Sequence, residues 1–256
     1  MAYETLLYEV NAGIGTITLN RPDRLNSFND TLHQEFIDVL KKAERDEAVR
    51  CLVITGSGRG FCAGQDLQAL GTRPVADIVR EYYNTWVTKI RTMEKPVLAA
   101  VNGVAAGAGC SLALACDLVI MSEKASFLQA FVKVGLVPDT GASYLLPRLI
   151  GYHKAMELAL FGEKVSAEEA QRLGLCNRVV PEAEFTHAVS EWAGRLARGP
   201  RSMGYMKRQI SRGMEQSFAE VLELEAYGQA AAAATADAKE AITAFLEKRE
   251  PNFTGR

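Results

Sequence analysis

The stretch PVLAAVNGVAAGAGCSLALACDLVIMS (96–122) places two apolar runs on either side of a segment of glycine and other small residues. PVLAAVNG and DLVIMS are short and continuous apolar runs, which are typical of strands buried on both faces. GAGCSLALACD, between them, indicates a helix of small residues. A strand, a helix and a second strand in this order predict two parallel strands joined by a right-handed crossover.

Strands and helices alternate in the preceding part of the chain as well. LLYEV (6–10) and GTITLN (15–20) predict a hairpin that turns at residues 11–13. Apolar side chains at helical spacing predict a helix over residues 29–46, and RCLVITG (50–56) predicts a buried strand. We therefore expect an α/β core with parallel strands.

The C-terminal part has a different pattern. Residues 123–199 predict short helices broken by glycine and proline, whereas three helical segments without an intervening strand follow Pro200. This change predicts a core over residues 1–199 and a helical region over residues 200–256. Two local expectations complete the assignment: a helix over residues 75–93, and Asp30 or Thr31 as the N-cap of the first helix.

The composition is that of an ordinary globular protein. Of 256 residues, 48% are apolar and 23% are charged, and 29 Lys and Arg balance 31 Asp and Glu to a net charge of −2. Without a dense basic run, we expect no nucleic-acid partner. The apolar runs are shorter than the ~20 residues of a membrane helix, and the N-terminus does not resemble a secretory signal, so we expect no membrane association and a cytoplasmic protein.

The cysteines indicate a reducing environment. The chain has five, an odd number, with no C-x-x-C pair and only three histidines. Because this pattern matches neither a disulfide framework nor a metal site, we expect buried reduced thiols and no metal.

Two glycine-rich loops follow neighbouring predicted strands. GSGRGFCAGQDL (56–67) lacks the Lys-Ser/Thr pair of a P-loop, and NGVAAGAGCSLALACD (102–117) enters a helix. The second loop is compatible with an anion at the helix N-terminus or with plain close packing. Together the loops could direct two backbone N–H groups at one oxygen, which is the geometry of an oxyanion hole.

The sequence resembles the crotonase superfamily of enoyl-CoA hydratases and isomerases along nearly its whole length. The resemblance rests on NRPDRLNSF (20–28), GFCAGQDL (60–67), AVNGVAAGAG (100–109), SAEEAQRLGLCNRVVP (166–181) and FLEKREPNFTGR (245–256), in this order. It implies a β-β-α spiral core with a helical C-terminal trimerisation region, and a homotrimer or hexamer. It also implies an acyl-CoA thioester substrate held as its enolate, with coenzyme A as part of the substrate and no separate cofactor.

The resemblance also assigns roles by position. It places the two oxyanion N–H donors at Gln65 and Ala108. The remaining substrate-binding residues that it implies are Ala63, Asp66, Leu67 and Gln68 along the acyl-CoA channel, Arg24 and Leu25 near the nucleotide end, and Phe131 beside the acyl group. For Asp66 the alternative is a loop acid that bonds its own backbone.

The residues at two positions of the sequence argue against a hydratase. Where the hydratases of this superfamily carry glutamates, this chain has Ser111 and Phe131, so neither place offers a titratable side chain. Ser111 as a nucleophile lacks a recognisable triad, and a packing role is the stronger interpretation. Cys62 and Cys110, near the expected site, are compatible with buried hydrophobes.

Asp139 is the predicted catalytic residue. GLVPDTG (135–141) resembles the turn of isomerases like the ring 1,2-epoxyphenylacetyl-CoA isomerases, in which one aspartate carries a proton between two carbons. Apolar neighbours such as Phe131 and Val137 are expected to raise the pKa of Asp139 by desolvation and to exclude water. The alternative is a helix N-cap.

We therefore expect an acyl-CoA isomerase that shifts a double bond in 3-enoyl-CoA or converts ring 1,2-epoxyphenylacetyl-CoA into an oxepin-CoA. A hydratase without the usual glutamates and a non-catalytic acyl-CoA-binding homologue are the alternatives. Tyr82, Tyr83 and Trp86, on the predicted second helix, either border the acyl pocket or belong to the core.

Overall fold

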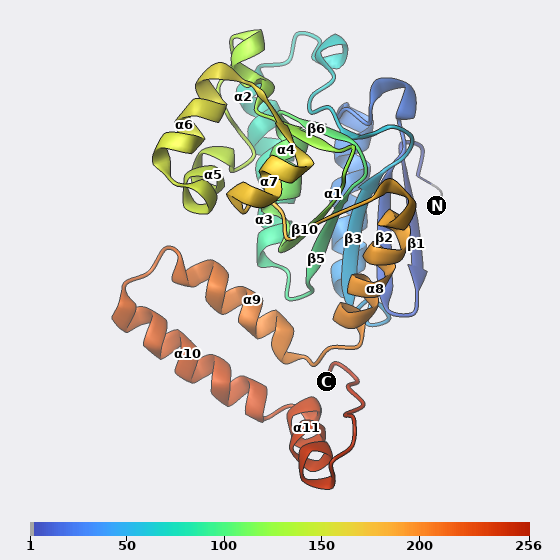
Figure 1. Ribbon diagram of the computed structural model, residues 1–256, viewed down its shortest axis with the longest axis vertical. Helices are drawn as coiled ribbons and strands as arrows, with labels where there is room; N and C mark the ends of the chain where they lie inside the picture. Colours follow the sequence, from blue (N-terminus) through green and yellow to red (C-terminus); the bar gives the residue numbers. More distant parts are fainter. Residues whose placement is uncertain (1–2) are drawn as a thin grey trace.

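The computed structural model describes residues 3–256 and contains a large sheet of six strands (Figure 1). The first two strands form an antiparallel hairpin, and the others run parallel to the second. In sheet order the strands are β1 (Leu6–Asn11), β2 (Ile14–Leu19), β3 (Cys51–Gly56), β5 (Val97–Val101), β7 (Leu118–Ser122) and β10 (Arg178–Val180). The predicted hairpin and the predicted buried strands are confirmed.

A second sheet consists of very short strands. They are β4 (Gly60–Cys62), β6 (Val104–Ala106), β8 (Ser126–Leu128) and β9 (Lys164–Ser166), of which only β9 is antiparallel to its neighbour. Each of β3, β5 and β7 is followed by a strand of this small sheet and then by helix, so the chain makes successive β-β-α turns. The expected spiral architecture is confirmed.

The sequence did not predict the short strands. β4 and β6 lie within the two glycine-rich loops, and β8, β9 and β10 lie in the segment expected to contain only short helices. Three residues are too few to show the alternation by which a strand is recognised.

Helices cover both faces of the large sheet. Their bounds are α1 (Asp30–Arg45), α2 (Val75–Ile78), α3 (Asn84–Thr92), α4 (Ala108–Ala115), α5 (Ala142–Ile150), α6 (Tyr152–Phe161), α7 (Ala167–Leu173), α8 (Phe185–Ala197), α9 (Ser202–Gly213), α10 (Phe218–Ala233) and α11 (Ala236–Glu247). Leu52 and Ile54 of β3 pack into the core on the α1 and α3 side, whereas Cys51 and Val53 pack against α8. This division follows from the alternation of side chains along a strand.

Two helix predictions need correction. The N-cap of α1 is Asn29, whose side chain accepts from the Leu32 amide, and not Asp30 or Thr31. The predicted helix over residues 75–93 is present, but a π-helical stretch, Val79–Tyr83, separates α2 from α3. Such π-helical turns occur frequently at functional sites.

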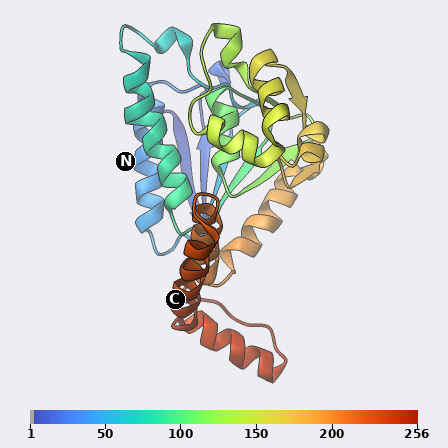
Figure 2. The same cartoon turned by 90° about the vertical axis from the view of Figure 1, so that its left-hand side faces the viewer.

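The helices α9, α10 and α11 project from one end of the α/β core (Figures 1 and 2). A largely buried ion pair between Lys207 of α9 and Asp117, 2.8 Å apart, joins them to the sheet. Apolar side chains remain exposed on these helices, among them Ile210, Phe218 and Phe245. The three helices are as expected, while the division at residue 200 stays a prediction.

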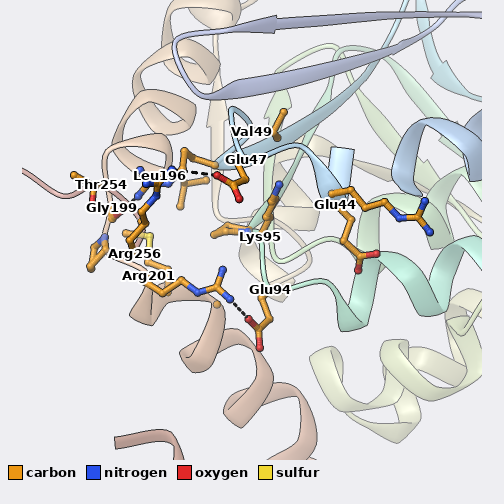
Figure 3. A pocket seen from close by; sticks show the side chains of 17 residues that line it. Glu44, Glu47, Val49, Glu94, Lys95, Leu196, Gly199, Arg201, Thr254 and Arg256 are labelled. Carbon is orange, nitrogen blue, oxygen red and sulfur yellow. Dashed lines mark hydrogen bonds and ion pairs between the residues drawn. The ribbon is translucent and has the colours of Figure 1, made fainter. Parts of the chain in front are cut away.

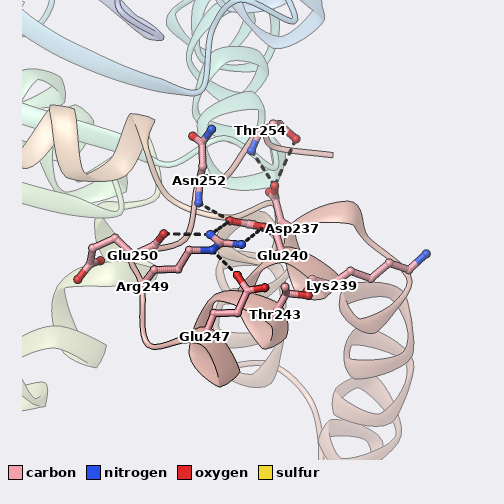
Figure 4. A network of polar contacts seen from close by, with 9 residues as sticks. All are labelled: Asp237, Lys239, Glu240, Thr243, Glu247, Arg249, Glu250, Asn252 and Thr254. Atoms are coloured by element: carbon pink, nitrogen blue, oxygen red, sulfur yellow. Dashed lines mark hydrogen bonds and ion pairs between the residues drawn. The ribbon is translucent and has the colours of Figure 1, made fainter.

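The C-terminal segment is held by polar contacts. Asp237, almost fully buried, accepts from the amides of Arg201, Thr254 and Gly255, and Arg249 pairs with Glu240 (Figure 4). These contacts fold the last residues back toward the core.

A polar pocket lies where this segment meets the core (Figure 3). Arg201 pairs there with Glu94 at 2.5 Å, and Arg256 pairs with Glu47 at 3.1 Å. Lys95 donates to two backbone carbonyls. Because these charged side chains already pair with protein groups, we interpret the pocket as a contact that holds the C-terminal segment against the core.

In the described part of the chain, no helix combines the length and apolar character needed to cross a membrane.

Candidate functional site

One predominantly apolar cavity brings together residues from both glycine-rich loops and from the segment before α5. Its volume is about 120 Å³. Six predicted site residues line it: Ala63, Gln65, Leu67, Ala108, Phe131 and Asp139. The rest of its wall is mainly aliphatic and aromatic, from Leu70, Val75, Ile78, Val79, Tyr83, Val134 and Leu136. A single carboxylate therefore lies in an apolar chamber.

Two glycines allow the loops to approach closely. A Cβ on Gly64 would lie 2.8 Å from the Ala106 carbonyl oxygen and 3.2 Å from the Ala108 nitrogen, and a Cβ on Gly109 would lie 2.0 Å from the Cys62 carbonyl oxygen. Gly64 also has a φ of +88°, which glycine adopts without strain. These glycines bring the backbone at Gln65 next to the first turn of α4.

The backbone amides of Gln65 and Ala108 are free to bind a ligand. Gln65 forms a parallel bridge with Phe28, in which the Gly64 carbonyl and the Asp66 amide make the hydrogen bonds. The N–H of Gln65 consequently points away from Phe28. Ala108 begins α4, where the amide has no intrahelical acceptor. Within residues 3–256 neither amide donates to a protein acceptor.

Asp139 lies in a turn before α5 and is partly buried. Thr140 Oγ1 donates to Asp139 Oδ1 at 2.8 Å. Burial raises the pKa of Asp139 above its ordinary value, and the hydrogen bond from Thr140 opposes that shift. Helix α5 begins at Ala142 after Gly141 and has no side-chain cap. The alternative interpretation of Asp139 as a helix N-cap is therefore wrong.

The side chain of Gln65 is held by residues that the sequence did not single out as a group. Tyr83 donates its hydroxyl to Gln65 Oε1 at 2.7 Å, and His33 Nε2 lies 3.2 Å from the same oxygen. His33 is fully buried on α1, and burial lowers its pKa to about 4. No sequence signal pointed to the role of His33, because a single histidine on an apolar helix face is usually a core residue. Of the aromatic residues considered for the pocket border, Tyr83 lines the cavity and Trp86 lies in the core.

Four predicted substrate-binding residues do not line this cavity: Asp66, Gln68, Arg24 and Leu25. Asp66 caps a short 3₁₀ helix (Leu67–Ala69) by accepting from the Gln68 amide, and it pairs with Arg21 at 3.0 Å. Arg24 donates to the Gln68 side chain at 3.0 Å. Asp66 thus bonds its own loop backbone, which was the alternative to substrate binding. Contact of these four residues with the acyl-CoA substrate stays a prediction.

The other candidate nucleophiles are buried. Ser111 is fully enclosed and donates to the Gly107 carbonyl at 3.2 Å, which supports its packing role. Burial raises the pKa of both the Cys62 and Cys110 thiols to about 12. All five cysteines are free and buried. Among residues 3–256, no cluster of three or more His, Cys, Asp or Glu could hold a metal ion.

Comparisons with known proteins place these features in a family. Residues 9–256 match the model of the enoyl-CoA hydratase/isomerase family. The 1,2-epoxyphenylacetyl-CoA isomerase of Escherichia coli is 45% identical over 99% of each chain. A protein of Rhodobacter capsulatus named "Probable enoyl-CoA hydratase" is also 45% identical, over 100% of each chain. The crystal structure of an enoyl-CoA hydratase from Bacillus anthracis covers 99% of this chain and 100% of its own, with a TM-score of 0.94 at 31% identity.

Proposed function

Because the chain belongs to the enoyl-CoA hydratase/isomerase family, we propose that it is an acyl-CoA isomerase in which Asp139 is both base and acid. The observation that carries the proposal is one partly buried carboxylate in the same apolar cavity as two free backbone amides. The thioester oxygen accepts hydrogen bonds from the backbone amides of Gln65 and Ala108. Removal of one donor of this kind typically lowers the rate by ~10²–10³.

For a 3-enoyl-CoA, Asp139 removes a proton from C2, and the electrons of the broken C–H bond move into the dienolate. The negative charge on the thioester oxygen is held by the two amides. The same carboxyl then returns the proton to C4, which conjugates the double bond with the thioester. One titratable group suffices because the proton taken is the proton returned.

A ring 1,2-epoxyphenylacetyl-CoA is the second candidate substrate, with an oxepin-CoA as product. It is supported by the name of the isomerase relative at 45% identity and by the aromatic and aliphatic wall that would surround a ring.

Hydration is the rival reaction, and the name of the Rhodobacter relative favours it. Against it, Ser111 is buried away from the cavity and Phe131 contributes an apolar wall. Asp139 is the sole carboxylate among the residues that line the cavity. Addition of water would require this one group both to activate the water and to protonate carbon.

The experiment compares the wild type with Asp139→Asn on 3-hexenoyl-CoA and follows conjugation to the thioester by ultraviolet absorbance. We expect the variant to lose about 10²–10⁴ in kcat, the usual contribution of a general acid or base. Asp23→Asn, at an exposed position, is the matched control. Equal activity of Asp139→Asn and wild type, or 3-hydroxyacyl-CoA formation from crotonyl-CoA at ordinary turnover, would overturn the proposal.

We further propose a homotrimer, or a hexamer of two trimers, in the cytoplasm. The exposed apolar residues of α9, α10 and α11 support an assembly, and five free cysteines support a reducing compartment. Light scattering of the purified chain tests the assembly, and a monomer at micromolar concentration would contradict it.

A further inference from the structure

A chain of side-chain contacts runs from Trp86 through His33 to Gln65, and it begins with an indole that can only donate a hydrogen bond. Its Nε1 donates to His33 Nδ1 at 3.4 Å. The imidazole is stacked between Phe28 and Tyr82, with 4.7 Å between ring centres on each side. Since burial lowers its pKa to about 4, His33 is neutral at pH 7. A neutral imidazole that accepts at Nδ1 carries its proton on Nε2.

The proton on His33 Nε2 sets the orientation of the Gln65 amide. His33 Nε2 lies 3.2 Å from Gln65 Oε1, and Tyr83 donates to the same oxygen at 2.7 Å. If the amide were flipped, its NH₂ group would face the N–H of His33, and two donors would oppose each other. The carbonyl oxygen of Gln65 therefore points at His33 and Tyr83, and the NH₂ group points the other way.

The NH₂ group of Gln65 has no acceptor in the part of the chain that the structure describes. Its nitrogen is also absent from the fully enclosed, unpartnered polar atoms of that part, so it remains accessible. Gln65 lines the cavity together with Tyr83 and Asp139. A residue that lines this mostly apolar cavity thus carries an accessible side-chain donor with one fixed orientation.

We propose that the Gln65 side-chain amide binds an oxygen atom of the acyl group, so that the natural substrate is an oxygen-bearing acyl-CoA, with a hydroxyl, ether or epoxide oxygen, and not a plain enoyl-CoA. The inference rests on the proposed function, which places the acyl group in this cavity. A site built to hydrogen-bond an oxygen discriminates against an analogue that lacks it, because its own donor is left unpaired. His33, Trp86 and Tyr83 are positioning residues that act through Gln65.

Binding, measured without turnover, tests the inference. We would measure by calorimetry the Kd of (2-hydroxyphenyl)acetyl-CoA and of phenylacetyl-CoA, which differ by one oxygen. The wild type is expected to prefer the hydroxylated ester by about tenfold, as one good hydrogen bond provides. Gln65→Met keeps the backbone N–H and the side-chain length, and its preference should fall to about twofold or less.

Two further variants separate orientation from packing. Tyr83→Phe removes one donor to Gln65 Oε1 and keeps the ring, so the preference should fall partway. Gln171→Met, on an exposed face of α7, should leave the preference unchanged. A packing defect would weaken both esters equally, whereas the inference requires the ratio of the two Kd values to change.

Equal affinity of the wild type for the two esters would overturn this inference alone. An unchanged ratio in Gln65→Met would do the same. Failure of the proposed function has a different signature, since Asp139→Asn would then isomerise 3-hexenoyl-CoA as the wild type does, whatever the ratio of binding constants. Absence of binding for both esters would also overturn this inference, whereas the proposed function would still be decided by the activity of Asp139→Asn on 3-hexenoyl-CoA.

Discussion

Gly64 and Ala108 approach so closely that a methyl group on Gly64 would lie 3.2 Å from the Ala108 amide nitrogen. We predict that Gly64→Ala lowers kcat by about 10²–10³, because the loops must separate and one oxyanion donor is displaced. The measurement is isomerisation of 3-hexenoyl-CoA by variant protein whose circular dichroism matches the wild type.

Gly71→Ala is the matched control. Gly71 also has a positive φ, +58°, but nothing lies within 4 Å of the added Cβ. Both variants therefore carry backbone strain of about 1 kcal/mol or more, and only Gly64→Ala moves the amides. A similar loss of activity in the two variants would show that strain, and not donor geometry, is responsible.

The pH dependence of kcat/KM should follow Asp139. The base must be ionised in the free enzyme, so kcat/KM should fall on the acidic side as Asp139 takes up a proton. Thr140→Val removes the hydroxyl that stabilises the carboxylate, which raises the pKa of Asp139 further. We expect the acidic limb of the profile to move to higher pH in Thr140→Val and to stay in place in Thr140→Ser; an identical limb in all three proteins would exclude Asp139 as the titrating group.

Asp139 should also reduce the stability of the folded protein at neutral pH. Its pKa is higher in the folded than in the unfolded chain, so its favourable contribution is present below the unfolded pKa of about 3.9 and is lost as pH rises through the folded pKa. At pH 7, Asp139→Asn should therefore have a higher Tm than the wild type, because the variant has no carboxylate charge to desolvate.

The difference in Tm between wild type and Asp139→Asn should narrow as the pH is lowered toward 4. Scanning calorimetry at several pH values measures it. If the difference in Tm did not change with pH, the higher stability of the variant would come from the asparagine side chain and not from removal of a buried charge.

The thiols near the site should be inert. Because burial raises the pKa of Cys62 and Cys110 to about 12, the thiolate fraction at pH 8 is very small. Native protein treated with iodoacetamide should keep its activity and show no label on these two residues by mass spectrometry. Unfolding in guanidinium should expose all five cysteines to the reagent; inactivation of the native protein with label on Cys62 would refute this expectation.

Lys207 should anchor the C-terminal helices. It pairs with Asp117 at 2.8 Å and donates to the Ile90 carbonyl at 2.7 Å, and both ionised side chains are largely buried. Lys207→Met leaves Asp117 without its partner, for which we expect a loss of about 3–5 kcal/mol in the free energy of unfolding. Lys239→Met, exposed on α11, should change it by about 0.5 kcal/mol or less. Urea titration followed by fluorescence distinguishes the two; equal midpoints would place the anchor elsewhere.

Much of the α/β core could be predicted from local patterns. Strands β3, β5 and β7 are continuous apolar runs, and α1 repeats its apolar residues at helical spacing. These patterns are strong because a strand or helix buried against a core must carry them along its whole length. The strands of the small sheet have three residues each, and no period can be read from so few.

The residues of the candidate site, too, were predicted from the sequence only in part. Gln65, Ala108 and Asp139 were predicted from motif positions, and the structure brings all three to one cavity. His33 was not predicted, because its environment depends on Tyr82 and Trp86, which are distant in the sequence, as well as on the stacked ring of Phe28.

The sequence by itself determined the order of the longer strands and helices, the two glycine loops and the family motifs. Only the tertiary structure decided that Asp139 faces the cavity without capping α5, that Asp66 turns away from it, and that the Gln65 amide has one orientation. The physical reason is that hydrophobic period and backbone propensity are local properties, whereas desolvation, hydrogen-bond direction and loop approach depend on groups that meet only when the chain has folded.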